Sequence, residues 1–162
     1  MSKKKIKRGL VLTGGGARGA YQVGALIAIA EICKDLNIDN PFQVISGSSA
    51  GAINSMFMAA NAHRFHDGAK QLKSLWEEMY VNNIYKSNFT SLMKTGFRFI
   101  LELSLGGLYK KKQARALLDT SPLKGLIEKN INFSNVQKNI DSGILHGVSV
   151  TAMNYTTGNS RI

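Results

Sequence analysis

Residues 42–62 read FQVISGSSAGAINSMFMAANA, and this stretch decides the fold. Residues 42–46 are mainly apolar and predict a short strand, and a helix is predicted from about Ala50 to Ala62. Between them, residues 47–51 read Gly-Ser-Ser-Ala-Gly. The pattern G-x-S-x-G between a strand and a helix is typical of the sharp turn called a nucleophile elbow, in which the flanking glycines leave room for the chain to turn.

The preceding segment has the same order of strand, glycine-rich turn and helix. Residues 9–13 (GLVLT) form a short apolar run of the kind that is buried on both faces of a sheet, and residues 14–19 read Gly-Gly-Gly-Ala-Arg-Gly. Apolar residues then recur at helical spacing as far as Leu36, and Cys33 falls on that side, where we expect it to be buried. This βαβα start predicts an α/β fold with a mainly parallel central sheet covered by helices.

The rest of the chain is predicted to continue the same domain, because 162 residues fit one domain with one core. A single cysteine excludes an internal disulfide, so packing alone must stabilise the fold. The remaining predicted elements are a helix with Leu72, Leu75, Trp76, Met79 and Tyr80 on one side, a helix around residues 93–102, a helix from Ser121 to about Ile131, a strand from Leu145 to Met153, a turn at 154–159 and a returning strand at 160–162.

Gly14, Gly16 and Gly19 also satisfy the dinucleotide-binding pattern G-x-G-x-x-G, in which glycines let a pyrophosphate approach backbone amides. In that fold an acidic residue stands at the end of the second strand. Here Asp39 precedes the second strand, and the strand ends instead in the serine turn. We therefore predict that the protein binds no dinucleotide, and the sequence indicates no other cofactor and no metal site.

The two glycine-rich turns together fit the chemistry of ester hydrolysis. This reaction passes through a tetrahedral intermediate whose oxyanion needs N–H donors that are already aimed at it. If the first two strands are neighbours, the amides of residues 14–16 lie beside the amide of Ala50 and can supply these donors. The candidate nucleophile is Ser49, in an elbow formed with Gly47, Ser48 and Gly51.

These motifs, with Asp119-Thr120-Ser121-Pro122-Leu123 further along, resemble the patatin-like phospholipase family, and the resemblance spans Gly9 to Gly158. It implies a three-layer α/β/α fold and a lipid acyl hydrolase, of the phospholipase A or lysophospholipase type, that uses a serine–aspartate dyad. By this resemblance Ser49 is the nucleophile, and Arg18 matches a basic position that serves either loop structure or phosphate contact. The loop that forms the oxyanion hole with Ala50 is then expected to comprise Gly14, Gly15, Gly16, Ala17, Arg18 and Gly19.

One departure from the family pattern concerns the catalytic aspartate. In the family it belongs to an Asp-Gly-Gly or Asp-Gly-Ala motif, well beyond the last residue of this chain. Residues 67–69 read Asp-Gly-Ala, but they follow Ser49 by only 18 residues, and we interpret the match as a coincidence. The remaining aspartates lack any such context: Asp35, Asp39, Asp119 and Asp141.

We therefore expect residues 1–8 to be a basic N-terminal tail and residues 9–162 to be a patatin-like phospholipase domain that is truncated, with its aspartate beyond the C-terminal end. A serine hydroxyl without its base stays protonated and is a poor nucleophile, so we expect little or no turnover from the 162-residue chain alone. Because the dyad needs no histidine, we expect surface or capping roles for His63, His66 and His146.

Three other functions share parts of this pattern. An α/β-hydrolase with a Ser-Asp-His triad has its elbow after several strands, whereas Ser49 follows the second. An acyl-carrier transacylase requires an activating histidine, which the sequence does not place. A catalytically incomplete module that binds a lipid surface or a protein would keep the fold and lose the dyad. Residues 86–115 interleave basic and apolar side chains, which fits either such an interfacial element or core packing with a basic outer face.

The net charge is +11, and basic residues are concentrated in residues 3–8 and 86–115. A basic surface attracts anionic lipid or nucleic acid, or only aids solubility, and no nucleic-acid-binding motif accompanies it. We expect a lipid ester such as a phospholipid as the substrate, an anionic membrane surface as a partner and no nucleic acid. The uncharged residues 41–62 are too polar for a membrane span. With no signal peptide and no transmembrane helix in view, we expect a cytoplasmic protein that can bind membranes peripherally.

Overall fold

The computed structural model describes residues 7–84, 121–153 and 159–162. Within these residues the sheet has four strands in the order β1-β2-β3-β4. The first three strands are parallel, and the fourth runs antiparallel to the third. The strands are β1 (Gly9–Leu12), β2 (Val44–Ser48), β3 (Gly147–Met153) and β4 (Ser160–Arg161). The parallel pairs require crossover connections, which helices supply.

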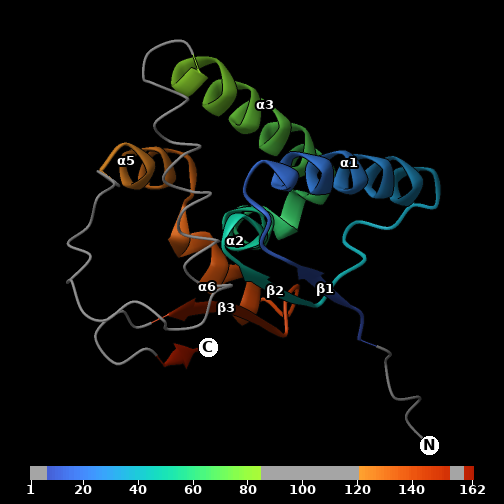
Figure 1. Ribbon diagram of the computed structural model, residues 1–162. Coiled ribbons are helices and arrows are strands. Elements are labelled where there is room, and N and C mark those ends of the chain that lie inside the picture. Colours follow the sequence, from blue (N-terminus) through green and yellow to red (C-terminus); the bar gives the residue numbers. More distant parts are fainter. Residues whose placement is uncertain (1–6, 85–120, 154–158) are drawn as a thin grey trace, which may run out of the picture.

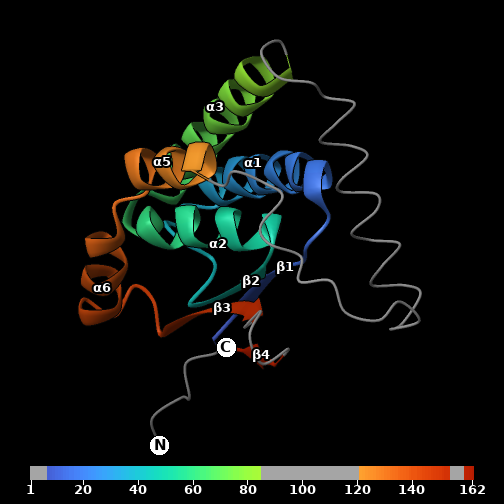
Figure 2. The ribbon, with the colours of Figure 1, turned by 60° about the vertical axis from the view of Figure 1, so that its left-hand side comes forward.

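Helices lie between consecutive parallel strands along the chain. They are η1 (Gly16–Arg18), α1 (Gly19–Asp35), α2 (Ala50–Ala60), η2 (Ala62–Arg64), α3 (Phe65–Ile84), α5 (Ser121–Asn130) and α6 (Phe133–Asp141). Figure 1 shows α2 next to the strands, with α1 and α3 beyond it. In the turned view of Figure 2, α1, α2, α3 and α5 are all on the same side of the strands. The central helix α2 is therefore enclosed by the sheet and the outer helices.

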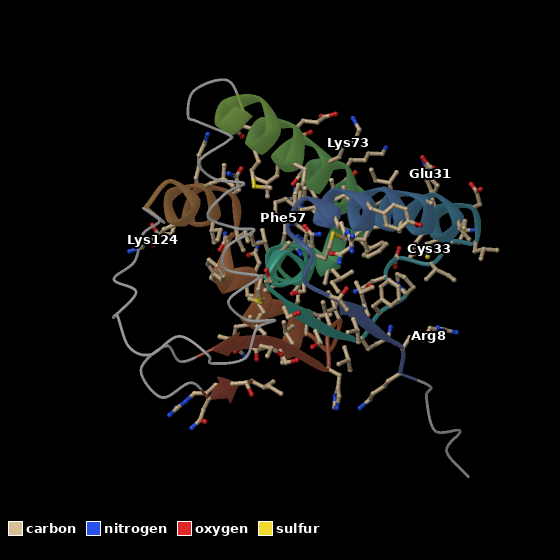
Figure 3. All side chains as sticks on the ribbon, in the orientation of Figure 1. Arg8, Glu31, Cys33, Phe57, Lys73 and Lys124 are labelled. Atoms are coloured by element: carbon tan, nitrogen blue, oxygen red, sulfur yellow. The ribbon has the colours of Figure 1, made fainter. Side chains whose placement is uncertain are left out.

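The hydrophobic core forms around α2. Leu12 of β1 and Ile45 of β2 are buried in the same cluster as Phe57 and Met58 of α2. Phe57 lies near the centre of the molecule in Figure 3, and Cys33 of α1 is buried, as predicted. A helix that is buried nearly all round carries apolar residues on all its sides, which explains the absence of charge in residues 42–62.

The helices that the structure describes cover one face of the sheet. Successive residues of a strand point to opposite faces, so Leu10 and Leu12 pack toward the helices while Val11 points away. Val11 is 72% exposed. A second helical layer, as in a three-layer arrangement, is not among the described residues.

The predicted α/β fold with a mainly parallel sheet is confirmed, and the differences from the sequence predictions are local. Strand β2 begins at Val44, two residues later than predicted, and continues through Ser48. Helix α6 was not predicted, because it is short and mostly polar; its N-cap, Asn132, accepts a hydrogen bond from the amide of Ser134. Leu36, predicted on the apolar side of a helix, caps the end of α1 and is exposed.

Several predicted features lie outside the described residues. They are the tail before Lys7, residues 86–115 with their predicted helix, Asp119 and Thr120, and most of the turn at 154–159. Of the helices that can be described, none is both long enough and apolar enough to cross a membrane.

Candidate active site

Ser49 lies at the turn between β2 and α2. Its backbone angles are φ 51° and ψ −126°. A residue other than glycine rarely adopts a positive φ, and holding it there costs on the order of 1–3 kcal/mol. The residue is exposed at the N-terminus of α2, where the helix dipole favours nearby negative charge. The Gly-Ser-Ser-Ala-Gly segment therefore forms a sharp elbow with a strained serine at its apex.

Close backbone contacts require glycine on both sides of this serine. A Cβ atom on Gly47 would overlap the carbonyl oxygen of Gly51 and the hydroxyl of Ser55. A Cβ atom on Gly51 would overlap the carbonyl oxygen of Leu12, at the end of β1. The start of α2 thus packs directly against the backbone of β1, which only a residue without a side chain permits.

The glycine-rich loop after β1 lies against the elbow. A Cβ atom on Gly14 would lie 3.0 Å from the Cβ atom of Ser49. This proximity follows from the sheet, because Leu12 is paired with Gly47 and both strands end at the same edge. Gly16 has φ 54°, a left-handed conformation that glycine adopts without steric cost. The two glycine-rich turns therefore meet beside Ser49.

The backbone amides around Ser49 differ in whether they are free to bind a ligand. The Gly14 amide donates to Ser48 Oγ at 3.1 Å. The Arg18 amide donates to the Gly15 carbonyl at 3.1 Å, and the Gly19 amide also bonds back into η1. Four amides of the expected oxyanion set donate no hydrogen bond within the described part of the chain: those of Gly15, Gly16, Ala17 and Ala50.

The Arg18 side chain covers the loop. Its Cβ and Cδ atoms would lie 3.1 and 3.5 Å from a Cβ atom on Gly15, so the aliphatic stem packs over that residue. Arg18 is exposed, and its guanidinium has no hydrogen bond or ion pair with any residue that the structure describes. Both roles left open by the sequence, loop structure and phosphate contact, are therefore compatible with its position.

Three polar side chains behind the loop were not predicted as part of the site. Gln22, Asn54 and Trp76 are joined by hydrogen bonds that also reach the ends of the glycine-rich loop. Periodicity alone assigns Trp76 to core packing. A signal was present at Asn54, because a lone asparagine inside an otherwise apolar helix needs hydrogen-bond partners when it is buried.

Asp67 is remote from Ser49. It lies in the first turn of α3, and the adjacent Gly68 packs against Asn61, just past the end of α2. Since a helix rises about 1.5 Å per residue, the 11 residues of α2 separate its two ends by about 16 Å. This separation agrees with the interpretation of Asp67-Gly68-Ala69 as a chance match.

The other titratable side chains that the structure describes do not form a site with Ser49. No carboxylate hydrogen-bonds to Ser49 within residues 7–84, 121–153 and 159–162. His63 and His146 are exposed and His66 is partly buried; the His146 ring lies 3.0 Å from Lys7 Nζ. In the same residues, no three His, Cys, Asp or Glu side chains gather closely enough to hold a metal ion.

The fold is an α/β fold with a mainly parallel sheet, in which a strained serine follows the second strand and lies beside a glycine-rich loop that follows the first strand. The family model for the patatin-like phospholipases matches residues 10–161. The chain therefore belongs to the patatin-like phospholipase family, and the resemblance seen in the sequence motifs is confirmed.

One solved structure is also similar, the heterodimeric complex ExoU–SpcU from the type III secretion system of Pseudomonas aeruginosa. The sequence identity is 20% and the TM-score 0.37. The match covers 90% of this chain and 30% of the other, so the chain spans less than a third of the structure that it matches. A comparison with curated proteins found no match.

Proposed function

We propose that the protein is a lipid acyl hydrolase in which Ser49 is the nucleophile. Membership of the patatin-like phospholipase family supports the reaction class. The observation that carries the proposal is the contact between the two turns: Ser49, held at φ 51°, lies next to Gly14 of a loop in which the amides of residues 15–17 donate no hydrogen bond to a described residue. An exposed serine beside backbone N–H donors supplies two of the groups that acyl transfer to a serine requires, the third being a base.

In the proposed reaction, Ser49 Oγ attacks the ester carbonyl carbon while an aspartate accepts the hydroxyl proton. The carbonyl oxygen becomes an oxyanion, which accepts hydrogen bonds from the amides of Gly15, Gly16 and Ala50. The bond to the alcohol then breaks, and the alcohol leaves with the proton from the aspartate. Water, deprotonated by the same carboxylate, hydrolyses the acyl-enzyme and releases the fatty acid. The Gly14 amide is not among these donors, because it is bonded to Ser48.

The aspartate of the dyad is proposed to follow Ile162 in the sequence, in the Asp-Gly-Gly or Asp-Gly-Ala context of the family. The position of Asp67 beyond the far end of α2 supports this proposal. A chain ending at residue 162 would then have little or no turnover. Robust hydrolysis by the 162-residue chain, lost in Ser49→Ala, would show that the base lies within these residues instead.

The test uses the full-length protein, a fluorophosphonate probe and vesicles of phosphatidylcholine with phosphatidylglycerol. We expect the probe to label Ser49, identified by mass spectrometry of the peptide, and Ser49→Ala to lower fatty-acid release by at least about a thousandfold. Ser74→Ala, on the exposed side of α3, is the matched control and should retain activity. Undiminished release in Ser49→Ala would exclude this nucleophile.

The same experiment separates hydrolysis from lipid binding alone. A folded protein that sediments with the vesicles, releases no fatty acid and takes up no probe would be the catalytically incomplete lipid-surface module.

We also propose that an anionic membrane surface is a partner, on the basis of the net charge of +11. Binding that disappears without phosphatidylglycerol, or at high salt, would support this partner; no binding at low salt would exclude it. The cytoplasmic location remains a prediction.

A further inference from the structure

Asn54 is a completely buried carboxamide in α2, about one turn beyond the elbow. Its Nδ2 donates to the Gly19 carbonyl oxygen at 3.0 Å and to Gln22 Oε1 at 2.9 Å. Its Oδ1 accepts a hydrogen bond from Trp76 Nε1 at 2.7 Å. Both amide hydrogens and the carbonyl oxygen thus have partners. A fully satisfied buried polar group of this kind adds directional constraint to packing that is otherwise apolar.

The hydrogen bonds from Asn54 reach both ends of the glycine-rich loop. One bond goes directly to Gly19, the first residue after the loop. The other continues through Gln22, whose Nε2 donates to the Thr13 carbonyl oxygen at 2.7 Å. Thr13 immediately precedes Gly14. Residues 14–18 are therefore held at both ends from one side chain of the helix that carries Ser49.

Trp76 connects this network to α3. A Cβ atom on Gly19 would lie 2.6 Å from Trp76 Cη2, so the indole packs directly on the backbone at the start of α1. The indole N–H then reaches Asn54. The network thereby joins α1, α2 and α3 immediately behind the loop.

We propose that Asn54, acting through Gln22 and Trp76, is a positioning residue that sets the place of the loop amides relative to Ser49. The proposal rests on the function proposed above. None of the three side chains needs to touch the substrate. Donors must stand about 2.7–3.1 Å from the oxyanion, so a small shift of the loop weakens the hydrogen bonds that form in the transition state. Such a loss lowers kcat and leaves KM nearly unchanged.

Three variants test the network, and one of them is a matched control. Gln22→Met removes the bonds to Thr13 and Asn54 from a partly buried position without adding charge. Asn54→Leu replaces the central carboxamide with a similar apolar volume. Asn139→Leu, on α6, is the control and makes the same change far from the loop. Asn139 is 3% exposed and donates to the carbonyls of Ala59 and Ala60, at the other end of α2, at 2.8 and 3.3 Å.

In the full-length protein we expect Gln22→Met and Asn54→Leu to lower kcat for ester hydrolysis by about 10- to 100-fold, with KM changed by less than about threefold. Asn139→Leu should lower Tm without lowering kcat. The proposal is overturned if Gln22→Met retains full kcat, or if Asn139→Leu loses as much kcat as the network variants. If Asn54→Leu does not fold, Gln22→Met carries the kinetic test.

A second measurement does not depend on activity. The amide resonances of Gly15 and Gly16 and the indole N–H resonance of Trp76, the one tryptophan in these 162 residues, report the loop and the network by NMR. We expect them to shift in Gln22→Met and to stay in place in Asn139→Leu. If the wild type hydrolyses no ester, the proposed function fails while these resonances still test the positioning. If activity is present and the resonances of Gln22→Met are unchanged, the positioning fails alone.

Discussion

The amide of Gly14 donates a hydrogen bond to the hydroxyl oxygen of Ser48, with 3.1 Å between the two atoms. The residues come from different turns: Gly14 follows β1 and Ser48 ends β2. The bond ties the glycine-rich loop to the elbow one residue before Ser49. Ser48, the second residue of the G-x-S-x-G pattern, thus has the role of holding the glycine-rich loop against the elbow.

This bond predicts different effects on kcat for substitution of Ser48 by threonine and by valine, whose side chains have nearly the same shape. Ser48→Thr keeps the hydroxyl, and Ser48→Val replaces it with a methyl group, leaving the Gly14 amide without its partner. We expect Ser48→Thr to retain kcat within about threefold and Ser48→Val to lower it by about 10- to 100-fold, because the loop amides move relative to Ser49. Steady-state ester hydrolysis measures both values. Equal activities in the two variants would contradict this role for the hydroxyl.

The contact between α2 and β1 predicts that Gly51 tolerates no side chain. Gly51→Ala places a methyl group onto the Leu12 carbonyl, and we expect it to lower the free energy of unfolding by about 3 kcal/mol or more. Gly24→Ala is the matched control in α1, where a Cβ atom meets nothing within 4 Å. Helix propensity should then raise stability by about 0.5–1 kcal/mol. Urea unfolding measures the free energy of unfolding of both variants. A Gly51→Ala protein as stable as the wild type would contradict the close contact between α2 and β1.

The positive φ of Ser49 predicts that the elbow stores strain. Ser49→Ala and Ser49→Gly both remove the hydroxyl, but only glycine adopts φ 51° without steric cost. After allowance for the greater freedom of glycine in the unfolded chain, we expect Ser49→Gly to be more stable than Ser49→Ala by about 1 kcal/mol. Thermal unfolding of the two variants measures the difference. An alanine variant of higher stability would indicate an unstrained backbone.

The exposed Arg18 guanidinium predicts a substrate-dependent effect. If it contacts the phosphate of a phospholipid, Arg18→Ala should raise KM for phosphatidylglycerol by about 5- to 20-fold and leave KM for an uncharged p-nitrophenyl ester nearly unchanged. If Arg18 acts only by covering Gly15, both substrates should be affected alike. We expect the first result. Parallel kinetics on the two substrates distinguish the two roles.

Much of the fold could be predicted because its signals are local. Gly9–Leu12 is a short apolar run and Val44–Ser48 begins with two β-branched apolar residues; each leads through a glycine-rich turn into a helix, and the two segments form adjacent parallel strands. Element boundaries were predicted less accurately: β2 starts two residues later than predicted. Helix α6 was missed although Phe133, Val136 and Ile140 recur at helical spacing, because the segment is short and its other residues are polar. Local patterns do not state where hydrogen bonding across a sheet begins, because that depends on the partner strand.

The sequence predicted the position of the sharp turn, while the arrangement of the groups around it was only partly predictable. The spacing of Gly47, Ser49 and Gly51 indicated the elbow. Which loop amides lack a partner among the described residues could not be read from the motif, because the Gly14 amide donates to Ser48, 34 residues away. The Asn54 network was also hidden, since its partners Gly19 and Trp76 lie 35 and 22 residues away in sequence.

By itself, the sequence determined the order of the first two strands and their helices, the two glycine-rich turns and the serine at the elbow, because backbone sterics and apolar periodicity act over a few neighbouring residues. Only the tertiary structure decided that Gly14 stands against Ser49, that Ser48 takes one loop amide, and that one buried asparagine ties the loop to three helices. These contacts join distant parts of the chain, and they exist only once the sheet register and the packing of α2 bring those parts together.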